Sequence, residues 1–214
     1  MELKGRMSRT ILNFSCFALD LSLVFYLNFP TPSSGILQSR RPLLANAAQP
    51  VEMRDASTLR NVYIEDFVVF PIVQQPSGKP NYVSKKAGEI TQFASAADYG
   101  NIGLLAHNFL SGKSFFQLHM GQEVHIEYSD GTTEVFVVTE ILRYQALEPK
   151  SPFSSFRNLS NTDEVLSTQQ MFERAYGGDR HITFQTCIAR YGNASWGRLF
   201  VMATPKIESL SIVQ

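Results

Sequence analysis

Three residues of types that take part in acyl transfer each stand directly beside an apolar run in this sequence. Cys187 closes the run at residues 182–186, and Arg198 stands eleven positions further on, just before another apolar run. His107 follows the apolar residues 103–106. A thiolate can attack a carbonyl carbon, an imidazole can carry the proton, and a guanidinium can stabilise the oxyanion. The pattern therefore predicts nucleophilic catalysis by a cysteine.

Each of the three residues also has an ordinary structural interpretation. Cysteine is often a small buried hydrophobe, a strand histidine can be a satisfied core residue, and an arginine beside an apolar strand can form a structural salt bridge. The chain holds two cysteines, and the other one, Cys16, lies in an apolar run near the N-terminus. Cys187 is thus the only cysteine from residue 59 onward. The residues that flank Cys187, His107 and Arg198 in the sequence favour the catalytic interpretation.

Those neighbours form four short motifs in a fixed order along the chain. They are Leu105-Ala106-His107-Asn108, Leu118-His119-Met120-Gly121-Gln122-Glu123-Val124, Thr183-Phe184-Gln185-Thr186-Cys187 and Arg198-Leu199-Phe200-Val201. Over roughly residues 60–205 the set resembles the sortases, the cysteine transpeptidases that attach proteins to bacterial cell surfaces. Phe184 replaces the leucine of the family's Thr-Leu-x-Thr-Cys motif, Ala106 replaces the usual glycine before the histidine, and Gln122 stands where aspartate is commoner.

The resemblance implies a fold and an activity. The fold is mainly β, a closed eight-stranded barrel with one or two short helices, preceded by an N-terminal apolar helix. The activity is cleavage of a sorting-signal peptide bond in a secreted protein through a thioester, with transfer of the acyl group to an amine of a cell-wall peptide or a pilin. The implied catalytic residues are His107, Cys187 and Arg198. The residues expected to contact the substrate are Thr186, Ala106, Asn108 and Trp196.

Two alternatives to a transpeptidase stay open at the level of sequence. The barrel could be catalytically silent or purely hydrolytic and serve to bind peptides. An L,D-transpeptidase is disfavoured, because the residues before Cys187 lack the histidine and the Ser-x-Gly that lead into the cysteine of that family.

Composition excludes several other classes of function. The 214 residues carry a formal net charge of +0 and no run of lysine and arginine, which argues against a nucleic-acid partner. The four histidines and two cysteines show no zinc-binding spacing, so neither a metal nor a cofactor is expected. A calcium site is the alternative for a set of strand carboxylates, but their alternation fits a solvated strand face better; these are Glu123, Glu127, Glu134 and Glu140.

The first 58 residues differ from the rest of the chain. Lys4, Arg6 and Arg9 precede a mostly apolar run at residues 11–29, which Asp20 interrupts. We expect residues 1–30 to form a signal anchor, or else a cleaved signal peptide, and residues 31–58 to form a flexible linker. Residues 59–214 would then be the catalytic domain, held outside the cytoplasm at the cell membrane by a single span.

Short alternating runs predict most of this domain as strands. The expected strands are 62–73, with Pro71 near one end, and then 102–106, 124–128, 134–144, 182–187 and 196–203. The turn Ser129-Asp130-Gly131 predicts a hairpin. One helix is expected after Ser167, which forms a capping box with Gln170, and Gly177-Gly178 would end it. It lies in the long connection 145–180, which forms a wall of the substrate groove in sortases.

Overall fold

The computed structural model describes residues 58–64 and 69–207 of the chain. The anchor and nearly all of the linker expected in residues 1–58 lie outside the described residues, which begin at Thr58. None of the helices in residues 58–64 and 69–207 combines the length and the hydropathy that a membrane span requires.

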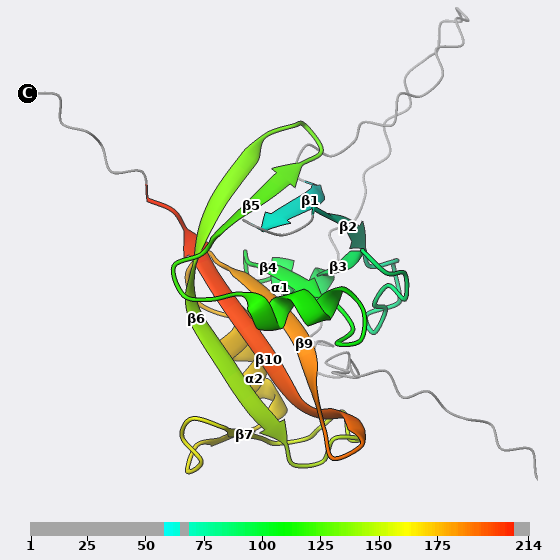
Figure 1. Cartoon of the computed structure of the whole chain (residues 1–214), viewed down its shortest axis with the longest axis vertical. Coiled ribbons are helices and arrows are strands. Elements are labelled where there is room, and N and C mark those ends of the chain that lie inside the picture. The colour runs from blue at the N-terminus through cyan, green and yellow to red at the C-terminus, as the bar shows by residue number, and fades with distance from the viewer. Residues whose placement is uncertain (1–57, 65–68, 208–214) are drawn as a thin grey trace, which may run out of the picture.

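Eight strands close into a barrel. Their order around the ring is β10–β9–β4–β3–β2–β1–β5–β6, and the ring closes because β10 pairs with β6 as well as with β9 (Figure 1). The bounds are β1 Leu59–Ile64, β2 Phe70–Gln74, β3 Ile90–Phe93, β4 Ile102–Leu105, β5 Glu123–Tyr128, β6 Thr133–Ala146, β9 Ile182–Arg190 and β10 Asn193–Pro205. Two short strands, β7 (Phe156–Asn158) and β8 (Val165–Leu166), extend the sheet from β6. The expectation of a mainly β, closed eight-stranded barrel is confirmed.

Two hydrophobic cores lie on opposite faces of this sheet. The larger fills the barrel, and it includes Leu104, Phe184 and Leu199. The smaller lies on the outer face, where side chains of β4, β6 and β10 pack against a helix; Leu105 and Phe200 belong to it. Because successive strand residues point to opposite faces, neighbours such as Leu104 and Leu105 fall into different cores.

That helix is α2 (Thr168–Tyr176), which lies behind the long strands β6, β10 and β9 in Figure 1. The expected capping box at its start is confirmed: Ser167 Oγ accepts from the Gln170 backbone, and Gln170 Oε1 accepts from the Ser167 backbone. Gly177 is the C-cap, as expected. The other helical segments of the described residues are α1 (Ala94–Ala97) and the 3-10 helix η1 (Ser111–Gln117).

The structure departs from the expected strands at two places. The run 62–73 is not one strand: its two parts fall in β1 and β2, which pair antiparallel with Asn61 opposite Pro71. Residues 65–68 between them lie outside the described part. Three strands were not predicted: β7 and β8 have only three and two residues, which is too few to show alternation, and the four residues of β3 lead directly into α1.

Candidate active site

Strand register brings the three predicted catalytic residues together, although they lie far apart in the sequence. Arg198 of β10 is the direct partner of Cys187 of β9. On the other side, β4 runs parallel to β9, and their pairing ends with Leu105 level with Gln185; His107 follows two residues beyond the end of β4, as Cys187 follows Gln185 on β9. Residues directly opposite on antiparallel strands, as Arg198 and Cys187 are, have Cβ atoms about 4.5–5.5 Å apart. Cys187 is thus flanked by His107 and Arg198, and we call these three residues the candidate triad.

The candidate triad lies on the outer face of the barrel. Phe184 points into the barrel, whereas Gln185 on the same strand accepts a hydrogen bond at 2.5 Å from the Tyr176 hydroxyl of α2. Cys187 stands two residues after Gln185 and so shares its face. Arg198 is two residues before Phe200, and His107 is two residues after Leu105, so both share the face of these outer-core residues. The three side chains therefore meet on one face, beside the helix that covers it.

Arg198 is buried, at 6% exposure, with no carboxylate to neutralise it among the described residues. Its Nη1 donates to the carbonyl oxygens of Ser195 and Gly197, each at 3.0 Å, and its guanidinium lies 5.8 Å from the centre of the Phe156 ring. Burial lowers the pKa of Arg198 to about 10, so it remains a cation at neutral pH. Its Nε is buried without a hydrogen-bond acceptor in the described structure. This N–H is a donor that a substrate carbonyl can use.

His107 is 7% exposed, and its ring stacks on Phe109 with the ring centres 5.2 Å apart. Burial lowers the pKa of His107, the positive charge of Lys85 lowers it further, and a hydrogen bond to the Val83 backbone partly opposes both. A neutral imidazole is therefore favoured at neutral pH. Such a ring can accept a proton from a thiol or an amine, and once protonated it is a strong enough acid to donate to a departing amine.

Cys187 is 1% exposed, so all three members of the candidate triad are shielded from water. Charges interact more strongly in such surroundings than in solvent. The Arg198 guanidinium is therefore a buried positive charge on the residue paired with Cys187.

Two residues predicted to contact the substrate direct their side chains away from the candidate triad. Thr186 is fully buried, and its hydroxyl donates to the Ala106 carbonyl oxygen at 2.8 Å. The Ala106 side chain belongs to the barrel core. The Thr186 hydroxyl thus ties β9 to the backbone just after β4, and any contact that Thr186 or Ala106 makes with a substrate must come from backbone groups.

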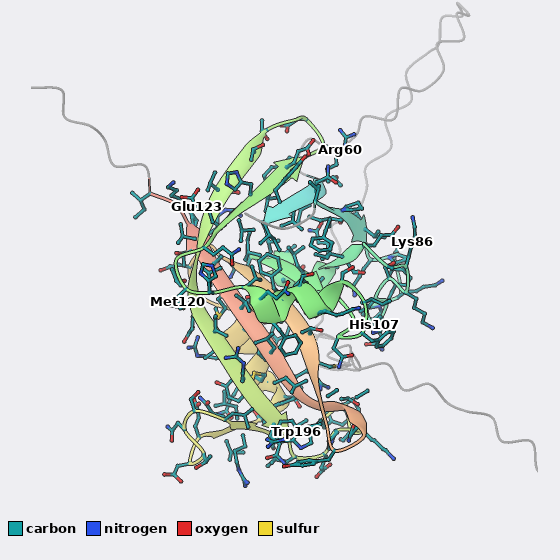
Figure 2. The ribbon with its side chains drawn as sticks, in the orientation of Figure 1. Arg60, Lys86, His107, Met120, Glu123 and Trp196 are labelled. Carbon is teal, nitrogen blue, oxygen red and sulfur yellow. The ribbon has the colours of Figure 1, made fainter. Side chains whose placement is uncertain are left out.

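The other two residues predicted to contact the substrate are Asn108, which is bonded to the start of β10, and Trp196, which belongs to that strand. The Asn108 amide donates to the Ala194 carbonyl oxygen at 3.1 Å, which ties the segment after His107 to β10. The Trp196 ring lies 5.0 Å from the guanidinium carbon of Arg190, and the Tyr191 ring lies 4.8 Å from the same atom. Cation–π contact thus orders the hairpin that joins β9 to β10, near the end of the strands where Figure 2 labels Trp196.

Gly112 was not predicted as a site residue, but it lets η1 pack closely against the backbone of His107 and the side chain of Thr186. The amide nitrogens of Leu110 and Gly112 both donate to the His107 carbonyl oxygen, at 2.9 and 3.0 Å. A Cβ atom at Gly112 would lie 2.3 Å from Thr186 Oγ1 and 2.7 Å from the His107 carbonyl oxygen. Only glycine allows this close approach. Nothing in the local sequence indicates it, because the partner Thr186 is distant in the chain.

The strand carboxylates considered for calcium are already engaged with protein groups. Glu123 pairs with Lys206, Glu127 accepts from Asn61 and Tyr63, Glu134 pairs with Arg180, and Glu140 pairs with Arg174. Among the described residues, no group of three or more potential metal ligands comes together.

Comparison with known proteins finds similarity in structure only. No protein-family model and no curated protein matches the sequence. Among solved structures, sortase C1 from Streptococcus suis has a TM-score of 0.47 at 14% identity, covering 73% of this chain and 77% of that one. Sortase E1 from Streptomyces coelicolor with a tripeptide in the active site has a TM-score of 0.46 at 20% identity, covering 71% and 90%. Sortase C1 of GBS pilus island 1 has a TM-score of 0.45 at 17% identity, covering 72% of this chain and 66% of that structure.

Proposed function

We propose that this chain is a sortase-type cysteine transpeptidase. One observation supports the proposal above all: Arg198 is the strand partner of Cys187, and His107 follows the end of β4, the strand on the other side of β9. The sequence motifs around the same three residues support it independently. Its substrates would be the sorting-signal peptide of a secreted protein and an amine of a cell-wall peptide or a pilin.

In the first half of the reaction, His107 takes the proton of Cys187 and the sulfur attacks the carbonyl carbon of the scissile peptide bond. The negative charge that develops on the carbonyl oxygen is stabilised by Arg198, whose buried Nε donor has no acceptor in the described structure. The carbon–nitrogen bond then breaks, and protonated His107 gives its proton to the departing amine. The product is a thioester between the substrate acyl group and Cys187.

In the second half, a second amine attacks the thioester carbonyl and loses a proton to neutral His107. The carbon–sulfur bond breaks, the acyl group stays on the new amine, and the sulfur leaves as the thiolate. The lowered pKa of His107 supports this role, because it keeps the ring in the form that can accept the proton. Water in place of the amine would give hydrolysis.

We further propose that the domain works outside the cytoplasm, attached to the cell membrane by one span. The apolar run 11–29 with basic residues before it supports this location. Protease protection of the intact chain in membrane vesicles tests it, since an extracytoplasmic domain is cleaved only from the outer side.

Detection of the thioester by intact mass tests the function. The protein, kept in a reductant, is mixed with a library of candidate sorting peptides, and the mass of the acyl adduct is recorded. Cys187→Ala should form no adduct. Arg198→Gln should form it about 10²–10³-fold more slowly, which is the usual cost of removing an oxyanion donor.

Two variants serve as matched controls. Arg143→Gln removes an exposed arginine from β6, the strand next to Arg198, and His125→Gln removes a half-exposed histidine from β5. Both should leave adduct formation unchanged. An adduct that forms equally fast in Arg198→Gln and in the unaltered protein contradicts the assignment of Arg198. Peptide binding with no adduct would favour the silent barrel, and an adduct that only water resolves would favour the hydrolytic one.

A further inference from the structure

A cavity of about 610 Å³ opens beside His107, on the side away from Arg198. The loop between β2 and β3 forms its other wall, through residues 78–83 and Lys85. In Figure 2 this loop, marked by Lys86, and His107 lie on the same side of the molecule. His107 is the one member of the candidate triad that lines the cavity, so a group bound there meets the imidazole first.

The cavity is electropositive. Its lining includes Lys79 and Lys85 and contains no carboxylate among the described residues. Both lysines are exposed, and neither forms an ion pair with a described carboxylate. The neighbouring Lys86 is different, because it pairs with Glu89 at 2.8 Å and does not line the cavity.

The position of His107 indicates which substrate would use this cavity. The amine that resolves the thioester must pass its proton to His107, so it has to approach on a side that the imidazole faces. Lys85 lies close enough for its charge to act on that ring: after burial, it is the second cause of the lowered pKa of His107. The same positive charges repel an ammonium group and favour the neutral amine, which is the nucleophilic form.

We propose that this cavity is the acceptor site and that Lys79 and Lys85 select an amine carried by a short peptide with a free carboxylate close to the amine. This inference rests on the proposed function, and it names the acceptor class that the function leaves open. The carboxylate would lie between the lysines with the amine directed at His107. An acceptor without an anion would be repelled as the ammonium and would gain no attraction from the lysines as the neutral amine, so it would bind less well.

Binding to a protein that cannot react tests the site separately from the reaction. Diglycine carries a free carboxylate, and diglycinamide is the same molecule with that charge removed. Each is titrated into Cys187→Ala protein while the ring signal of His107 is followed by NMR at low ionic strength. We expect diglycine to bind about two- to tenfold more tightly, as two exposed ion pairs allow, and salt should reduce the difference.

The lysine variants locate the effect. In Lys79→Gln/Lys85→Gln the preference for diglycine should disappear, whereas in the matched control Lys86→Gln it should persist. Equal binding of the two compounds, or a preference that survives the double substitution, overturns the proposal.

The same two compounds are then used as acceptors with the thioester, where the readout is the concentration that gives half-maximal transfer. Transfer without preference for diglycine would leave the transpeptidase intact and reject the anionic acceptor site. The expected binding preference in a protein that forms no thioester would keep the anion site and reject the proposed function.

Discussion

Replacement of Gly112 by alanine is expected to displace His107 while leaving the barrel folded. A Cβ atom at this position would lie 2.3 Å from Thr186 Oγ1, 2.7 Å from the His107 carbonyl oxygen and 2.8 Å from the Ala106 carbonyl oxygen. Ordinary van der Waals contact begins at 3.4 Å, so the Thr186 contact alone demands a shift of about 1.1 Å. Thr186 cannot rotate away without losing its hydrogen bond to Ala106. The segment from His107 to Gly112 must therefore move.

The size of the effect follows from that displacement. Overpacking of a well-filled site costs about 1–3 kcal/mol of the free energy of unfolding, which a barrel of this size tolerates. A catalytic group misplaced by about 1 Å costs on the order of 100-fold in rate. Since the His107 carbonyl accepts from the backbone of Gly112, the imidazole shifts with η1. We expect a loss of about 100-fold in the rate of thioester formation.

Gly103→Ala is the matched control for this experiment. A Cβ atom there would lie 2.8 Å from Cβ of Phe93 and 2.9 Å from Cβ of Ala96, so it also overpacks the protein, but away from the candidate triad. Thermal unfolding and the single-turnover rate are measured for both variants. Both should lower the melting temperature, and only Gly112→Ala should greatly slow thioester formation. Equal rate losses in the two variants would show that overpacking, and not the position of His107, determines the rate.

Three further outcomes are expected. Thr186→Val leaves the buried Ala106 carbonyl without its donor, so it should lower the free energy of unfolding measured in urea by about 1–3 kcal/mol; an unchanged unfolding midpoint contradicts that role. Ser167→Ala removes the N-cap of α2 and should cost about 0.5–2 kcal/mol in the same assay, with Ser167→Gly costing only a few tenths. Folding lowers the pKa of His107 from its ordinary 6.5, so the unfolded chain protonates this histidine at a higher pH than the folded protein does. The free energy of unfolding should therefore fall as the pH drops from 6.5 toward the lowered pKa. In His107→Gln this part of the pH dependence should be absent, and an identical pH profile in the two proteins rejects the assignment.

The sequence determined the fold class and the residue types of the site. Alternation along β5 and β6, the turn between them and the capping box at Ser167 are local patterns, and the structure confirms each of them. Such features can be read from sequence because the interactions that fix them lie within a few residues. Short β3, β7 and β8 could not be read in this way, because their pairing partners rather than their own residues specify them.

The tertiary structure decided where the site residues lie relative to one another. The motifs indicated His107, Cys187 and Arg198, but their meeting on one face depends on β9 lying between β4 and β10 in a particular register. A slip of one residue would turn Cys187 into the barrel core.

The sequence alone could not reveal Gly112 or the lysine-lined cavity, and it could not show that the Thr186 side chain points into the barrel. Each of these facts depends on contact between segments remote in the chain. The local sequence thus determined which chemical groups the site contains. Strand pairing between distant segments decided how these groups are arranged, because only the closed sheet brings those segments within bonding distance.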